Sequence, residues 1–107
     1  MKQKIQEELV RQIQQEVEYQ LRENDKHEDD YRKASEFHTR YIQLLNEDAT
    51  KYPHFIMYIL QEHIVEEEKI VGVDTIEGDL NQYEKGRIYS LVRCKHMIRV
   101  ATEIASR

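Results

Sequence analysis

The near absence of helix-breaking residues is the feature that most constrains this chain, which holds one proline and three glycines among its 107 residues. A fold built of strands needs many tight turns, and tight turns draw on glycine and proline. Apolar residues make up 39% of the chain and charged residues 35%, a mixture typical of amphipathic helices with solvated outer faces. The sequence therefore predicts an all-α fold in a single domain spanning residues 1–107.

Apolar periodicity divides the chain into a bundle of about four helices. In residues 2–23 an apolar side chain recurs at every fourth position, which predicts a long amphipathic N-terminal helix. The polar stretch 23–30 predicts a break, where Asp25 and Glu28 have the spacing of a capping box; one long continuous helix is the alternative. Residues 26–46 then show the alternating three- and four-residue spacings of a coiled-coil seam, at Tyr31, Ala34, His38, Tyr41 and Leu45.

The third predicted helix begins at Pro53, because proline is favoured at the first helical position, and it runs to about Val71. Its first half, Phe55–Leu60, is apolar on all sides and is expected to be the most buried segment of the chain. The second half is amphipathic, with the run Glu66–Glu68 expected in solvent. The apolar residues expected inside are Ile64, Val65 and Ile70.

The last helix, residues 79–105, is expected to be central in the bundle because its apolar positions form a broad stripe. The stripe holds Leu80, Tyr83, Leu91, Cys94, Met97, Ile98, Ala101, Ile104 and Ala105. Arg87 falls inside this stripe, beside Gly86. A buried guanidinium needs a partner, so an ion pair with Glu36 or Glu62 is predicted. A place for Arg87 in a ligand or partner pocket is the alternative.

Charge is distributed unevenly along the chain. The net charge is −5, but residues 85–107 carry six Lys or Arg against one Asp or Glu. One interpretation is that the basic last helix packs among acidic helices, which neutralise it. The other is a surface that binds an anionic ligand or nucleic acid. The candidate residues for such a surface are Lys85, Arg87, Tyr89, Arg93, Lys95, His96 and Arg99.

The spacing motifs of helical-bundle enzymes do not occur in this sequence. No histidine has a glutamate three residues before it, as di-iron bundles require, and Glu-x-x-Glu, Glu-x-x-Asp, His-x-x-x-His and glycine-rich phosphate loops are absent. His63 shares a helical face with Glu66 or Glu67, but this set supplies too few ligands for zinc. The sequence therefore predicts a non-enzyme without catalytic residues, metal ligands or cofactors.

Two single residues carry further expectations. Cys94 is the only cysteine, which excludes an intrachain disulfide, and it is expected to act as a small hydrophobe in the core. His38, within the apolar seam, is expected to hydrogen-bond a backbone carbonyl or a tyrosine: Tyr31, Tyr41 or Tyr58. No signal pattern or membrane-spanning apolar run is present, so a cytoplasmic protein that does not contact membrane is predicted.

The segment Leu80-x-x-Tyr83-x-x-Gly86-Arg87-Ile88-x-x-Leu91 resembles the closing helix of many short bacteriophage-encoded proteins, in which a Tyr/Leu, Gly-Arg-Ile, Leu pattern recurs near the C-terminus. Where such proteins usually continue with tryptophan or leucine, this chain continues RCKHMI. The resemblance implies a small helical viral accessory or assembly protein, in a bacterial or phage-infected host cell. It carries over no catalytic residue.

The first helix indicates how such a protein acts. A chain this small is expected to leave a long amphipathic helix partly uncovered, and such faces often pack against a second copy. Residues 1–24 are therefore predicted to be an oligomerisation arm that is the least attached part of the bundle. Its expected interface is Ile5, Leu9, Ile13, Val17 and Leu21. The overall prediction is a non-catalytic interaction or assembly protein that forms homo-oligomers and binds a protein partner.

Overall fold

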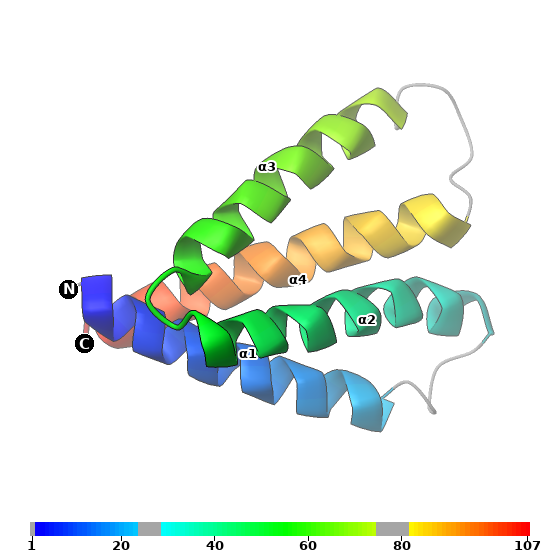
Figure 1. Ribbon diagram of the computed structural model, residues 1–107. Helices are drawn as coiled ribbons and strands as arrows, with labels where there is room; N and C mark the ends of the chain where they lie inside the picture. Colours follow the sequence, from blue (N-terminus) through cyan, green and yellow to red (C-terminus); the bar gives the residue numbers. More distant parts are fainter. Residues whose placement is uncertain (1, 24–28, 75–81) are drawn as a thin grey trace.

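The computed structural model describes residues 2–23, 29–74 and 82–107, and within them it contains four α-helices and no strand. They are α1 (Lys2–Glu23), α2 (Asp29–Lys51), α3 (Ile56–Asp74) and α4 (Gln82–Ala105) (Figure 1). The all-α bundle predicted from the sequence is confirmed. Because α1 ends at Glu23 and packs against α2, the two are separate helices. The predicted capping box at residues 25–28 lies outside the described residues.

Consecutive helices run in opposite directions, and the start of α1 lies near the end of α4 (Figure 1). The last helix is central, as predicted, because α4 contacts all three others, most extensively α2 and α1. The expectation that the first helix is the least attached was wrong. That place belongs to α3, which packs mainly on α4 and touches α2 only slightly; in Figure 1 it rises away from α2 along its length.

The core lies where α1, α2 and α4 meet, with the first half of α3 closing one side. Its buried apolar side chains are Leu9, Ile13, Ile42, Leu45, Ala49, Ile56, Leu60, Ile64, Leu91, Cys94, Met97 and Ala101. Burial of such side chains contributes about 25 cal/mol per Å² of apolar surface removed from water. Cys94 is fully buried, which confirms its predicted place in the core. The side chains of Tyr31, Ala34, Leu80 and Tyr83 lie outside the described residues.

The α1 seam differs from the four-residue repeat read from the sequence. Its buried positions are Leu9, Ile13, Glu16 and Gln20, whose spacings of four, three and four follow one face of a helix packed nearly parallel to its neighbours. A strict four-residue repeat drifts around the helix, and Leu21 accordingly lies 51% exposed. Leu9 and Ile13 of the predicted oligomer interface are therefore buried inside the bundle, while Ile5 and Val17 are half-buried.

The end of α2 and the start of α3 both lie at later residues than predicted. Instead of stopping near Asn46, α2 continues to Lys51, because Ala49 adds a buried turn to the core and the Thr50 hydroxyl donates to the Asn46 carbonyl at 3.0 Å. Pro53 lies in the turn that follows rather than at the first position of α3. The Phe55 amide donates to the Tyr52 carbonyl at 3.0 Å and closes that turn.

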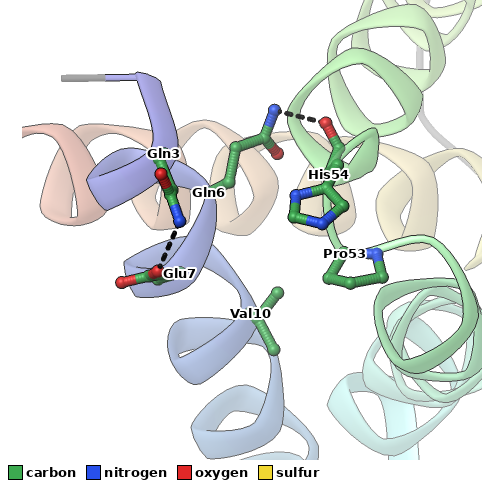
Figure 2. A pocket seen from close by; sticks show the side chains of 6 residues that line it. All are labelled: Gln3, Gln6, Glu7, Val10, Pro53 and His54. Carbon is green, nitrogen blue, oxygen red and sulfur yellow. Dashed lines mark hydrogen bonds between the residues drawn. The ribbon is translucent and has the colours of Figure 1, made fainter.

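A glutamine from the first helix fastens this turn to the bundle. Figure 2 shows Gln6 reaching from α1 toward His54. The side-chain Nε2 of Gln6 donates a hydrogen bond to the backbone carbonyl of His54 at 2.9 Å. The Oε1 of Gln6 accepts from the backbone amide of Met57 at 2.9 Å, one of the N–H groups that the start of a helix leaves without an intrahelical partner. Gln6 therefore caps α3 from another helix, a role that sequence reasoning missed.

The third helix is less buried than predicted. Only one stripe of it faces the bundle, at Ile56, Leu60, Ile64 and Glu67. Phe55 and Tyr58 are 63% and 64% exposed, and Val65 and Ile70 are also exposed. The expectations that Phe55–Leu60 is buried all round and that Val65 and Ile70 point inward were wrong. The physical reason is that α3 packs mainly on α4 and only lightly on α1 and α2, so apolar side chains on its other side stay in solvent.

Paired leucine variants on α1 test this packing. Leu9→Ala should lower the free energy of unfolding by about 2–5 kcal/mol, because it removes a fully buried side chain and leaves a cavity. Leu21→Ala, in the same helix and the same repeat, should change it by roughly 0.5 kcal/mol or less, as exposed positions do. Urea unfolding followed by circular dichroism measures both. Equal losses would contradict the α1 seam described above.

Candidate functional site

A cluster of hydrogen-bonded polar side chains lies inside the bundle and joins three helices. We call it the relay, and it consists of Glu16, His38, Ser90 and Arg93. His38 of α2 stands between Glu16 of α1 and Ser90 of α4: its Nε2 is 2.9 Å from Glu16 Oε2 and its Nδ1 is 2.8 Å from Ser90 Oγ. All three side chains are buried. The edge of the Tyr89 ring also contacts His38, at 5.5 Å between ring centroids.

Arg93 of α4 completes the relay by holding the carboxylate of Glu16 at two points. Its Nε donates to Oε2 at 2.8 Å and its Nη2 donates to Oε1 at 2.5 Å. Burial alone raises the pKa of Glu16, but the hydrogen bonds and charges of Arg93 and His38 outweigh it and lower this pKa to about 2. The bond to Glu16 in turn raises the pKa of Arg93, so both groups are charged at neutral pH.

The charge of Glu16 fixes the direction of its hydrogen bond with His38. An ionised carboxylate only accepts, so His38 donates through Nε2–H, while its Nδ1 faces the Ser90 hydroxyl, a group that can either donate or accept. The thiol of Cys94 lies 4.0 Å from Ser90 Oγ and can donate to it, because burial raises the pKa of Cys94 to about 12 and keeps it protonated.

The residue types match the serine, histidine and carboxylate of hydrolases, but the geometry does not serve that chemistry. A serine nucleophile must reach a substrate carbonyl, and Ser90 is completely shielded from solvent. The relay instead joins α1, α2 and α4 at one level of the bundle. The predicted tyrosine or backbone partner of His38 was wrong. The signal that was missed is that Glu16 occupies the three-and-four spacing of Leu9, Ile13 and Gln20.

A second ion pair joins α4 to α3. Arg87 Nη1 donates to both carboxylate oxygens of Glu67, at 2.9 and 2.7 Å, and both side chains are largely buried. The guanidinium also lies over the Phe37 ring, 5.5 Å from its centroid. An internal ion pair for Arg87 is confirmed, but the partners named from the sequence, Glu36 and Glu62, were wrong. Glu67 was expected in solvent, yet it continues the buried stripe of α3.

Beside this ion pair, Tyr41 of α2 stacks on His63 of α3. Their ring centroids are 3.7 Å apart and their planes differ by 13°. Burial raises the pKa of Tyr41 and lowers that of His63, so both rings are neutral at pH 7. The pairing of His63 with Glu66 or Glu67 considered from the sequence is not formed as a ligand set: Glu67 is bound to Arg87, and Glu66 pairs with Lys69 at 3.8 Å.

Most of the candidate anion-binding surface on α4 is engaged within the chain. Arg87 and Arg93 hold the glutamates described above, and Lys95 Nζ lies 3.1 Å from the Glu68 carboxylate. The Tyr89 hydroxyl accepts a hydrogen bond from Gln20 Nε2 at 2.9 Å. The remaining candidates lie exposed on α4: Lys85, His96 and Arg99. The observed contacts favour the interpretation in which acidic neighbours neutralise the basic helix.

Exposed apolar side chains also lie along α3. Four exposed residues with spacings of four, three and four follow one line on this helix, and Phe55, exposed in the turn before it, continues the line; we call these five residues the outer face of α3: Phe55, Tyr58, Glu62, Val65 and Lys69. Beside this line runs a groove of about 420 Å³. It is lined by Met57, Tyr58 and Gln61 of α3, Ile5 and Gln6 of α1, and Ile98 and Thr102 of α4. Exposed apolar and aromatic groups beside a groove are typical of docking surfaces.

Within residues 2–23, 29–74 and 82–107, no group of three or more histidine, cysteine, aspartate or glutamate side chains is placed to hold a metal ion. Over the same part of the chain, no helix has both the length and the apolar character required to cross a bilayer.

The low pKa of Glu16 predicts acid sensitivity. Because this pKa is 4.5 as an ordinary value and about 2 in the folded protein, its stabilisation is fully present above pH 4.5 and is lost as the pH falls toward 2. Glu16→Gln should destabilise the protein at pH 7, and its deficit relative to wild type should shrink between pH 5 and 2. Urea unfolding at several pH values measures this. A deficit that stays constant with pH would contradict it.

The Arg87–Glu67 ion pair predicts a second set of stability changes. Arg87→Ala or Glu67→Ala should each cost on the order of 3–5 kcal/mol, because each leaves the other charge buried without its partner. The exposed neighbour in Glu66→Ala should be nearly neutral. Replacing the pair together, Arg87→Met with Glu67→Leu, should recover most of the loss. Melting temperatures compare all four, and a single variant as stable as wild type would refute the prediction.

Comparison with known proteins does not indicate a function for this chain. No protein-family model, curated protein or solved structure matches the chain. The resemblance of Leu80–Leu91 to short phage-encoded proteins therefore stays a prediction.

Proposed function

We propose that this chain is a non-catalytic interaction protein whose outer face of α3 docks onto another polypeptide. The observation that carries the proposal is the exposure of two aromatic side chains, Tyr58 in the apolar first half of α3 and Phe55 in the turn directly before it. Buried aromatic anchors supply much of the binding energy at protein interfaces, and tyrosine is enriched there because one end is apolar and the other polar.

The arrangement of the rest of the molecule supports this use. The side chains of Glu16, His38 and Ser90 hydrogen-bond one another and join α1, α2 and α4. Arg87 binds Glu67 and joins α4 to α3. Three exposed large apolar side chains, Tyr58, Val65 and Ile70, lie on α3, the helix that packs least extensively against the others. These contacts support a docking surface on α3 rather than on the N-terminal helix, whose Leu9 and Ile13 are enclosed.

Site-specific photo-crosslinking tests the proposal. A photoreactive amino acid replaces Tyr58 in one variant and Leu44 in a matched control, since Leu44 is also an exposed apolar residue, 61% accessible, but on α2. Irradiation in the protein's own cells should yield a discrete polypeptide adduct at position 58 and none at position 44. Mass spectrometry identifies the adduct, and competition by unlabelled wild-type protein shows that the contact is specific.

Two results would refute the proposal. One is the absence of a discrete adduct at position 58, and the other is an equal yield at positions 58 and 44. Circular dichroism of both variants should match that of wild type, because neither side chain contributes to the core.

A further inference from the structure

We propose that His63 makes the attachment of α3 sensitive to pH, because α3 leaves its place on the bundle when the imidazole of His63 becomes protonated. The contact concerned is the stack of Tyr41 on His63, with ring centroids 3.7 Å apart and planes that differ by 13°. Among the described helices, α2 and α3 pack less extensively than any other pair, and Figure 1 shows α3 rising away from α2. The stack is therefore a principal contact between these two helices.

The enclosed nitrogen of this ring has no acceptor for a second proton. Within the described residues, Nε2 of His63 is buried without a hydrogen-bond partner, and so is the hydroxyl of Tyr41. A neutral imidazole can keep its single N–H on Nδ1, whereas an imidazolium carries an N–H on both nitrogens. Protonation therefore creates a charged donor at Nε2 that nothing accepts from, and burying such a group is costly. Once α3 has left the bundle, water supplies the missing acceptor.

Burial is the largest of the effects that act on His63, and it lowers the pKa of the ring below its ordinary value of 6.5. Charged groups from three helices oppose it or add to it. Glu67 of α3 favours the protonated ring, but Arg87 of α4 already binds both oxygens of that carboxylate. Arg87 itself and His38 of α2 disfavour a further positive charge. The face of the Tyr41 ring attracts a cation, but it supplies no acceptor for Nε2–H.

The direction of the pH dependence follows from this lowered pKa. Well above pH 6.5 the ring is neutral whether α3 is attached or released, so the attachment has its full strength. As the pH falls below 6.5, the released form of α3 takes up a proton more readily than the attached form. The attachment then weakens by up to about tenfold for each pH unit, until the pH has fallen through the lowered pKa of the attached form.

Protection of a thiol at position 60 tests the proposal. Leu60 is fully buried where α3 meets the bundle, so a cysteine introduced by Leu60→Cys reacts with a thiol reagent only when α3 has moved away. Protection is the reaction rate in concentrated urea divided by the rate in buffer at the same pH, a ratio that removes the pH dependence of the thiol itself. Mass spectrometry separates the modified peptide from that of Cys94. Protection should fall roughly three- to tenfold from about pH 7.5 to about pH 5.5.

Matched variants assign this fall to one ring. His63→Phe in the same background keeps an aromatic ring for Tyr41 to stack on but cannot take up a proton, so most of the fall should disappear. His96→Gln removes an exposed histidine of α4 and should leave the fall unchanged. A fall that persists in full in the His63→Phe variant would overturn the proposal, because another group would then cause it.

A second thiol distinguishes release of α3 from unfolding of the whole bundle. Ile13 of α1 is also fully buried, and a cysteine introduced there by Ile13→Cys should be better protected than the one at position 60 at both pH values. Equal protection at the two positions would show that position 60 is exposed only when the entire bundle unfolds, and would overturn the proposal.

Nuclear magnetic resonance gives the titration of the ring directly. The imidazole signals of His63, identified by their loss in the His63→Phe variant, should shift with a midpoint below that of the same ring in concentrated urea. A midpoint equal to or above the urea value would mean that protonation leaves the attachment of α3 unchanged or strengthens it, and that result also overturns the proposal.

Discussion

The packing of α1, α2 and α4 depends on one buried carboxylate, that of Glu16. A charge removed from water costs several kcal/mol unless it is fully paired, and Glu16 is paired only when His38 of α2 and Arg93 of α4 stand at the same level of the bundle. A helix that slides or rotates by one residue loses these bonds. Apolar contacts alone would allow several registers between these helices. The hydrogen bonds of Glu16 select one of them.

The second ion pair plays the corresponding part for α3. Arg87 and Glu67 join α3 to α4, and Gln6 joins the first turn of α3 to α1. These two ties lie toward opposite ends of a helix that has few neighbours along the rest of its length. Apolar burial thus places α3 on one side of the bundle, while directional polar contacts fix its angle and register.

Sequence reasoning recovered the helices and the central place of the last helix because these depend on local spacing and on the scarcity of breakers. It identified Arg87 because an arginine that interrupts an apolar helical stripe can be recognised from the sequence alone. It missed Glu16 and Glu67 because a glutamate at a seam position looks like any surface glutamate until its partner on another helix is known. It overestimated the burial of α3 because apolar composition does not say how many neighbours a helix has.

The peripheral position of α3 also bears on how the molecule opens. Local unfolding starts in elements with few contacts, so the backbone amide hydrogens of α3 are expected to exchange with solvent at a lower free energy than those of α1, α2 and α4. The docking surface that we propose lies on this same helix. A partner that binds only the folded form of α3 stabilises that form by mass action. The fraction of α3 that is folded therefore increases with the fraction of molecules that have a partner bound.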